Sequence, residues 1–152
     1  MNTRYFALIL GIMFLLIGVM GFIPGLVTHD MPTGTTDVGS HADHGRLLGL
    51  FPVNTMHNLV HLAFGAWGVI AYRRWDASRT YARATAIIYG LLAIMGLIPN
   101  FNTMFGMVPL HGHDVWLHAA IAAAAAYFGF ATSRDPAHAS HGAVTDTGAT
   151  HH

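Results

Sequence analysis

Four long apolar runs dominate this sequence and restrict what the chain can fold into. They cover roughly residues 5–23, 54–72, 81–98 and 114–132. Each is close to the roughly 20 residues that an α-helix needs to cross a bilayer. Charged residues make up only 9% of the chain, too few to cover a water-facing surface, since soluble domains carry about 25%. The sequence therefore predicts an all-α, four-transmembrane-helix bundle rather than a soluble domain.

The first run resembles a secretory signal peptide in its position but differs from one in length. The apolar core of a signal peptide has about 7–15 residues and is followed by a small-residue cleavage site. Residues 5–23 form a longer run, and the segment Gly21–Gly25 that ends it lacks such a site. Pro24 and Gly25 are typical of a helix end, so we expect the helix to be retained.

The two halves of the sequence resemble each other. An offset of 75 residues aligns the first helix with the third, and an offset of 57 aligns the second with the fourth. The matched pairs include Arg4 with Arg79, Phe14 with Tyr89, Gly21 with Gly96, Pro24 with Pro99, Pro52 with Pro109, and His61 with His118. We predict two parallel helical-hairpin repeats, residues 4–75 and 79–132. They would form one transmembrane domain, residues 1–133, followed by a disordered polar tail, residues 134–152.

The arginines predict the orientation of the chain in the membrane. Six of the seven basic residues lie at the expected ends of the hairpins where the first and third helices begin, and only Arg46 lies on the other side. Cytoplasmic loops carry an excess of basic residues. We therefore expect a multi-pass protein of the cell (inner or plasma) membrane with both termini in the cytoplasm. The outward loop, residues 29–44, has no counterpart in the second half and is predicted to be dispensable for folding.

Ionisable side chains inside the predicted spans mark a candidate site. His57 and His61 are four residues apart and share one helix face, as do Asp114 and His118 at the matching positions. Three imidazoles and a carboxylate suit a divalent transition metal such as zinc, and copper or nickel also fit the donors. The outer loop offers further donors that would pass metal to the site or simply form a solvated connection: His29, Asp30, Asp37, His41, Asp43 and His44.

Two other interpretations of these residues remain open. In the first, Asn54 and Asp114 only cap helices, and the bundle is a structural subunit that binds other membrane proteins or a second copy of itself. In the second, His61 and His118 ligate a haem from both faces, as in a small b-type membrane cytochrome. Metal and haem analysis separates these interpretations.

Several function classes are disfavoured. The net charge is zero, so nucleic acid is not an expected partner. The expected partner is the lipid bilayer, because of the long apolar runs. Cysteine is absent, which excludes disulfides and thiolate metal sites. The sequence has no Glu, no Gly-rich phosphate loop and no nucleophile elbow. A non-enzymatic role is therefore favoured.

Three motifs carry a resemblance to a known family. They are the Gly21–Gly25 segment, the Leu47–Phe51 segment, and Asn54 followed by His57-Asn58-Leu59-Val60-His61. Pro109, Asp114 and Leu117-His118 in the second half fit as well. From about Arg4 to Ala131 the chain resembles domain of unknown function family 4383, from bacterial membrane proteins. Family members often have Asn after the Asp, where this chain has Val115. The resemblance implies a four-helix integral membrane protein and no particular activity.

Overall fold

The computed structural model describes residues 2–28, 45–102, 104, 107–110 and 112–133. The predictions made for residues 29–44 and for the tail, residues 134–152, lie outside these ranges. The described chain is mostly helical. Its helices are α1 (Thr3–Met20), α2 (Thr55–Ala71), α3 (Trp75–Leu97) and α4 (His113–Ala126), with the short turns η1 (Pro24–Leu26) and η2 (Tyr127–Ala131).

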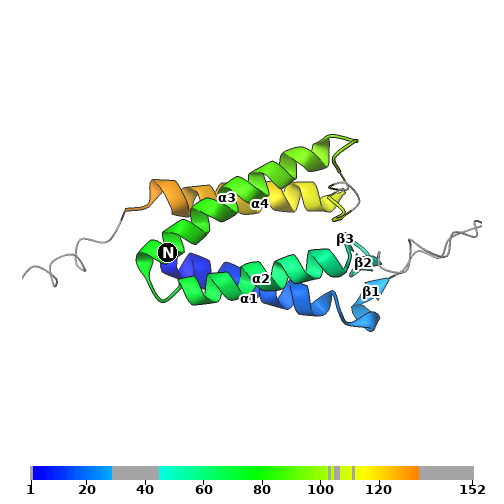
Figure 1. Cartoon of the computed structure of the whole chain (residues 1–152), viewed down its shortest axis with the longest axis horizontal. Helices are drawn as coiled ribbons and strands as arrows, with labels where there is room; N and C mark the ends of the chain where they lie inside the picture. Colours follow the sequence, from blue (N-terminus) through cyan, green and yellow to red (C-terminus); the bar gives the residue numbers. More distant parts are fainter. Residues whose placement is uncertain (1, 29–44, 103, 105–106, 111, 134–152) are drawn as a thin grey trace, which may run out of the picture.

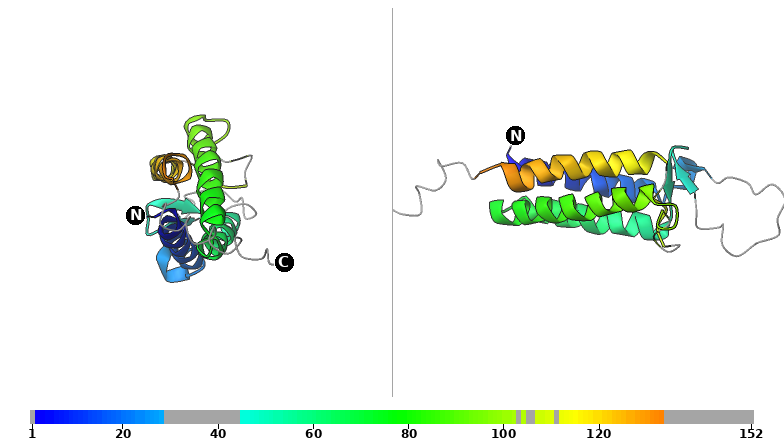
Figure 2. Two further views of the ribbon diagram at one scale, coloured as in Figure 1. Left: turned by 90° about the vertical axis from the view of Figure 1, so that its left-hand side faces the viewer. Right: turned by 90° about the horizontal axis from the view of Figure 1, so that it is seen from above.

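The four helices form two layers. Figure 1 shows the α1/α2 pair below the α3/α4 pair, and the end-on view in Figure 2 places α1 diagonally opposite α3. Helices α1 and α3 begin at the same end of the bundle, and α2 and α4 begin at the other. The buried apolar core lies between the layers and includes Phe6, Leu10, Phe14, Tyr81 and Tyr89.

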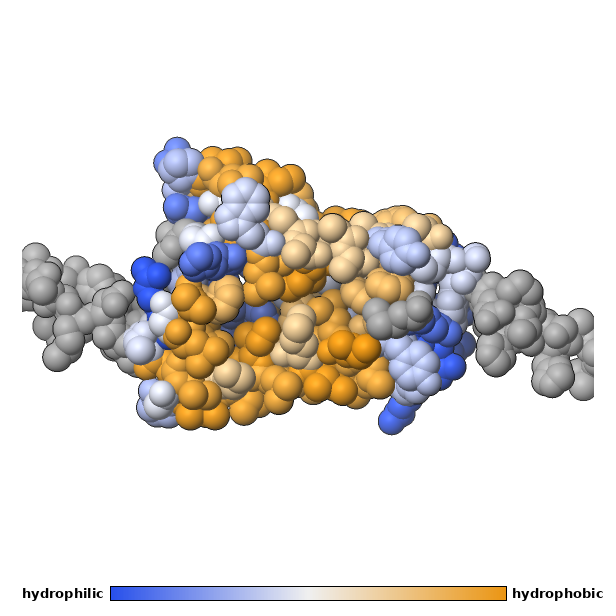
Figure 3. Space-filling model, turned by 180° about the vertical axis from the view of Figure 1, so that it is seen from behind, coloured by the Kyte–Doolittle hydropathy of each residue, from blue (hydrophilic) through white to orange (hydrophobic). Residues whose placement is uncertain are grey.

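Three of the helical segments in the described chain are long and apolar enough to cross a membrane. They are Thr3–Met20, Trp75–Leu97 and His113–Ala131. Helix α2 has 17 residues, at the lower end of the ~17–25 residues that span a bilayer. Figure 3 shows an apolar band along the visible face, with polar residues gathered at both ends. This surface fits a membrane protein.

A small sheet closes the end of the bundle where α1 stops and α2 starts. Strands β1 (Val27–Thr28), β2 (Gly45–Leu47) and β3 (Phe51–Val53) pair antiparallel in that order. The β2–β3 turn uses positive φ angles at Leu48 and Gly49, a backbone that glycine adopts at little cost. The sequence pattern does not predict these strands, because each is only two or three residues long.

The start of α2 agrees with the expected one, and the start of α3 differs. Helix α2 begins at Thr55, directly after its N-cap Asn54, and Pro52 lies in the edge strand β3, where proline removes no ladder hydrogen bond from the sheet interior. Helix α3 starts at Trp75, six residues before the expected Tyr81, and carries Asp76 in its first turn. The acidic side chain interacts favourably with the helix dipole there, so the charged segment continues as helix.

Arginine side chains bind the ends of the neighbouring helices. Arg4 Nε donates to Tyr72 O at 2.8 Å, and Arg79 Nε donates to Gly129 O at 3.0 Å. Arg83 Nε also donates to Gly129 O, at 2.9 Å. The carbonyls at a helix end have no partner within the helix and carry partial negative charge. These arginines therefore neutralise the helix ends at one end of the bundle.

Buried hydroxyl groups connect the two layers at the same end. Thr3 Oγ1 of α1 donates to Phe128 O of η2, in the α3/α4 layer, at 3.3 Å. Ser78 Oγ of α3 donates to Ala71 O of α2, in the α1/α2 layer, at 2.8 Å. Thr3 lies 75 residues before Ser78, and Ala71 lies 57 before Phe128. The two contacts are thus made by residues related through the offsets seen in the sequence.

Candidate functional site

The start of α2 is set by the side chain of Asn54. Its Oδ1 accepts from His57 N at 2.8 Å, which caps the helix as the sequence predicted, and its Nδ2 donates to Met107 O at 2.7 Å. The second bond ties α2 to the segment that leads into α4. His57 is therefore held in the first turn of the helix, where its side chain is 4% exposed.

The two histidines of α2 stack on each other inside the bundle. The ring centroids of His57 and His61 lie 4.3 Å apart, with the planes nearly parallel at 1°. His61 Nδ1 lies 3.1 Å from His57 O. A carbonyl only accepts, so Nδ1 carries the proton and Nε2 keeps its lone pair. The hydrogen bond thus sets the tautomer and orientation of the His61 ring.

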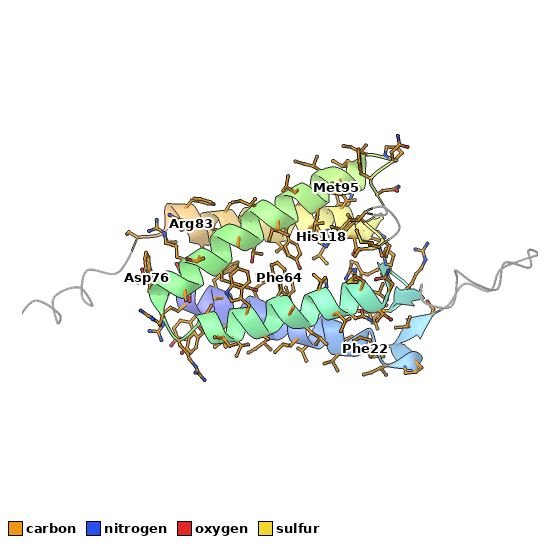
Figure 4. All side chains as sticks on the ribbon, in the orientation of Figure 1. Phe22, Phe64, Asp76, Arg83, Met95 and His118 are labelled. Carbon is orange, nitrogen blue, oxygen red and sulfur yellow. The ribbon has the colours of Figure 1, made fainter. Side chains whose placement is uncertain are left out.

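A chain of aromatic rings joins α2 to α4 through the core. Phe14 of α1 and Tyr89 of α3 stack with centroids 5.2 Å apart. His61 meets the Phe14 ring edge-on at 5.2 Å and 85°, and His118 meets the Tyr89 ring edge-on at 5.1 Å and 85°. Figure 4 shows His118 pointing between the two helix layers. The imidazoles of the two halves therefore occupy matching positions on either side of a central ring pair.

The α4 members of the site lie in its first two turns. Asp114 and His118 are 2% and 3% exposed, and the helix begins after Gly112 rather than after a side-chain cap. His118 is close enough to His57 and His61 to interact with them electrostatically, and Asp114 is as close to Tyr89. All four residues singled out in the sequence thus point into the bundle and not toward lipid.

Several buried polar atoms of the site lack a hydrogen-bond partner in the described chain. They include Nδ1 of His57, Nδ1 of His118 and Oδ2 of Asp114, together with Oδ1 of the neighbouring Asn58. Leaving such a group unpaired costs about 1–3 kcal/mol. Deeper in the core the Tyr81 and Thr85 hydroxyls lie near each other but outside strict hydrogen-bond geometry. The site is therefore polar, buried and incompletely satisfied.

The donors do not stand as a ligand set around one point. Within the described ranges, no group of three or more His or Asp side chains is placed to hold a metal ion. His61 and His118 each pack edge-on against one ring of the Phe14–Tyr89 stack. The haem interpretation therefore stays a prediction.

Two kinds of residue at the site were not named as candidates from the sequence. Phe14 and Tyr89 connect the histidines, and Asn58 contributes an unpaired amide oxygen. Phe14 and Tyr89 are matched by the 75-residue offset, so the repeat contained the signal. The signal for Asn58 was its place directly after His57, in the His57–His61 run that carries the family resemblance.

The family comparison agrees with the resemblance seen in the sequence. Residues 4–131 match the family described as domain of unknown function, DUF4383. No curated protein matches the chain. No solved structure matches it either. The family match covers all four helices and every residue of the candidate site, and the chain therefore belongs to the DUF4383 family.

Proposed function

We propose that this chain is a four-span membrane protein built from two parallel hairpin repeats. Four pairs of contacts related by the 75- and 57-residue offsets support the repeat. They are Arg4–Tyr72 with Arg79–Gly129, Thr3–Phe128 with Ser78–Ala71, Phe14–His61 with Tyr89–His118, and Gly21–Asn58 with Gly96–Val115. The common direction of α1 and α3 fits a rotation axis along the membrane normal.

The arginine distribution supports the orientation with both termini in the cytoplasm. Arg4, Arg73, Arg74, Arg79 and Arg83 all lie at the end where α1 and α3 begin, and Arg46 lies in the sheet at the opposite end. A cysteine placed at position 41, in the outer loop, tests this. We expect a membrane-impermeant reagent to label this cysteine from the outer face. Labelling only from the cytoplasmic face would show that the orientation is the opposite one.

We further propose that His57, His61, Asp114 and His118 form an outward-facing site that binds a divalent transition metal such as zinc. The observation that carries this proposal is the set of three unpaired buried atoms: Nδ1 of His57, Nδ1 of His118 and Oδ2 of Asp114. Ionisable residues within a membrane segment are costly and usually functional. A bound cation would satisfy these atoms together.

Metal binding at this site requires the side chains to turn from their stacked arrangement toward a common point. No hydrogen bond holds the Nδ1 atom of His57 or of His118 in the described chain, so turning either ring breaks packing contacts alone at that nitrogen. Imidazole and carboxylate donors at i and i+4 on two helices can then surround one ion. The site would be a binding site and not a catalytic one.

Metal analysis of the purified full-length protein tests the site directly. We expect about one zinc per chain after dialysis, and Co²⁺ substitution should produce the visible absorption of a tetrahedral centre. His61→Ala and His118→Ala should each lower the metal affinity at least tenfold, consistent with the loss of one ligand. His113→Ala is the matched control, because His113 is exposed in the same helix turn. Protein that binds no metal at all would exclude the proposal.

A structural or interaction subunit without chemistry is the second candidate. The filled ring stack of Phe14, Tyr89, His61 and His118 favours it, since aromatic and imidazole packing stabilises a core without any ligand. Under this candidate the metal content is zero. Co-purification of a defined membrane partner, or a stable homo-oligomer in detergent, would then be expected.

A further inference from the structure

A second polar feature lies beside the histidine stack, at the start of α2. A pocket of about 200 Å³ opens between the end of α1, the start of α2 and the small sheet. Its lining combines apolar side chains and backbone with two amides, and includes Gly21, Pro24, Gly45, Val53, Asn54 and Asn58. The pocket lies at the end of the bundle that carries the sheet, at the level expected for lipid headgroups.

Asn58 is the unsatisfied polar group of this pocket. Its side chain is 2% exposed, and its Oδ1 has no hydrogen-bond partner in the described chain. The other amide, Asn54, already uses both its oxygen and its nitrogen in hydrogen bonds. An occupant would therefore bond to Asn58 rather than to Asn54, after the buried Asn58 amide turns from Gly21 toward the pocket.

The second half of the chain shows that Asn58 is not needed for packing. Asn58 packs so closely on Gly21 that a methyl group there would overlap its amide. At the matching contact, a methyl group on Gly96 would lie 2.8 Å from Val115 Cγ2, and still closer to Leu110 O. An apolar side chain therefore fills this place in α4, while α2 keeps a buried amide with an unpaired oxygen. A buried polar group without a partner in the protein needs an explanation, and a bound molecule that supplies the missing hydrogen bond is one.

We propose that this pocket binds a small neutral hydroxyl-bearing group, held by hydrogen bonding to the Asn58 amide. An amide carries an acceptor oxygen and a donor nitrogen, and a hydroxyl, which both donates and accepts, can pair with either. The pocket places Phe22, Ile23 and Val27 around the same space, which suits a short carbon skeleton carrying the hydroxyl. Either the glycerol headgroup of a phospholipid or a free polyol presents this chemistry.

A titration of the full-length chain in phosphatidylcholine bicelles tests the proposal. The backbone amide resonances of Gly21 and Gly45 report on the pocket, and the probes are free glycerol and phosphatidylglycerol. We expect a saturable shift with at least one probe. Phosphatidylglycerol alone would identify a lipid source, and glycerol alone a free polyol. Phosphatidylcholine has no headgroup hydrogen-bond donor, so further additions of it should cause no saturable shift.

Three variants decide whether Asn58 is the binding group. Asn58→Val copies the second half of the chain; it should weaken binding at least tenfold and leave the thermal midpoint unchanged or raised. Ile23→Trp fills the pocket from its exposed rim and should also weaken binding, with Asn58 intact. Asn100→Val, the same change at an exposed position, should leave binding unchanged.

Three results would overturn the proposal. They are the absence of a saturable shift with both probes, equal binding by Asn58→Val and wild type, and a saturable response to phosphatidylcholine. A thermal midpoint lowered by Asn58→Val but not by Asn100→Val would assign Asn58 a structural role instead. If Asn58→Val failed to fold, Ile23→Trp would still decide, because unchanged binding by that variant contradicts the pocket.

Discussion

The two hairpins of this protein share a direction and a set of contacts but pack their helices by different means. In the α1/α2 pair, glycines bring the backbones together: a methyl group at Gly65 would lie 2.8 Å from Gly11 O, and one at Gly68 would lie 2.9 Å from Gly11 Cα. The matching positions of the α3/α4 pair are Ala86, Ala122 and Ala125. At the α3/α4 contact a methyl group on Gly90 would lie 3.9 Å from Ala122 Cβ, with room to spare.

The same contrast appears at the two interfaces between the layers. Between α2 and α3, Trp67 packs edge-on against Tyr81 with centroids 5.3 Å apart. The residues that match these by offset are Ala124 and Phe6, and they line an apolar groove of about 340 Å³ between α1 and α4. Helices in a membrane associate through packing and not through the hydrophobic effect. Each interface can therefore be closed by small residues or filled by large ones.

The glycine contact should give the largest effect. Gly65→Ala inserts a methyl group against the α1 backbone, and such overpacking costs about 1–3 kcal/mol. Gly90→Ala is the matched control at the α3 contact; it should be neutral or stabilise by up to about 1 kcal/mol through helix propensity. Equilibrium unfolding in mixed detergent micelles measures both. Equal losses in the two variants would contradict the difference between the hairpins.

The histidine contacts should behave alike in the two halves. His61→Ala and His118→Ala each remove an edge-on ring contact with the Phe14–Tyr89 pair, worth about 0.5–1.5 kcal/mol beyond area burial. His61 also loses its bond to His57 O, so its replacement should cost slightly more. The same unfolding measurement, made on metal-free protein, separates this loss from any effect of a ligand. A loss confined to one half would weaken the case for equivalent sites.

The hydroxyl contacts between the layers should differ by a smaller amount. Ser78 Oγ donates to Ala71 O at 2.8 Å and lies 3.1 Å from Arg74 O. Thr3 Oγ1 lies 3.3 Å from Phe128 O and 2.8 Å from Thr132 Oγ1. Because Thr132 Oγ1 itself donates to Phe128 O at 2.7 Å, that carbonyl keeps a partner when Thr3 is replaced. Ser78→Ala should cost about 1 kcal/mol, within the usual range for one hydrogen bond, and Thr3→Ala about half as much. The order of the two unfolding midpoints checks this. A larger loss for Thr3→Ala would contradict it.

Filling the groove should have the smallest effect on stability. Ala124→Trp copies the aromatic side chain of the other side into the space between α1 and α4. Because the groove faces lipid, the change should alter the unfolding free energy by no more than about 0.5 kcal/mol. A loss of unfolding free energy several times that size would show that the groove between α1 and α4 is closed or occupied in the membrane.

Sequence patterns predicted the four helices and the buried polar residues, but not the short strands or the start of α3. The long apolar runs indicated all four helices, because hydrophobic length is a local property. The offset between Phe14 and Tyr89 already related the two rings that meet at the centre. The strands β1, β2 and β3 and the early start of α3 at Trp75 escaped prediction, because short pairing and helix ends depend on neighbours distant in the chain.

The sequence alone determined which segments are apolar enough to span a bilayer, the arginine bias and the recurrence of polar residues at equal offsets. Each follows from the composition of a single segment or from comparison of two segments. Only the tertiary structure decided that His57 stacks on His61, and that no third His or Asp of the described residues is placed to share a metal ion with them. It also placed the unpaired amide of Asn58 in a pocket closed by Gly21 and the sheet. These contacts depend on helix rotation and separation, which are set by the side chains of both partners and not by either helix alone.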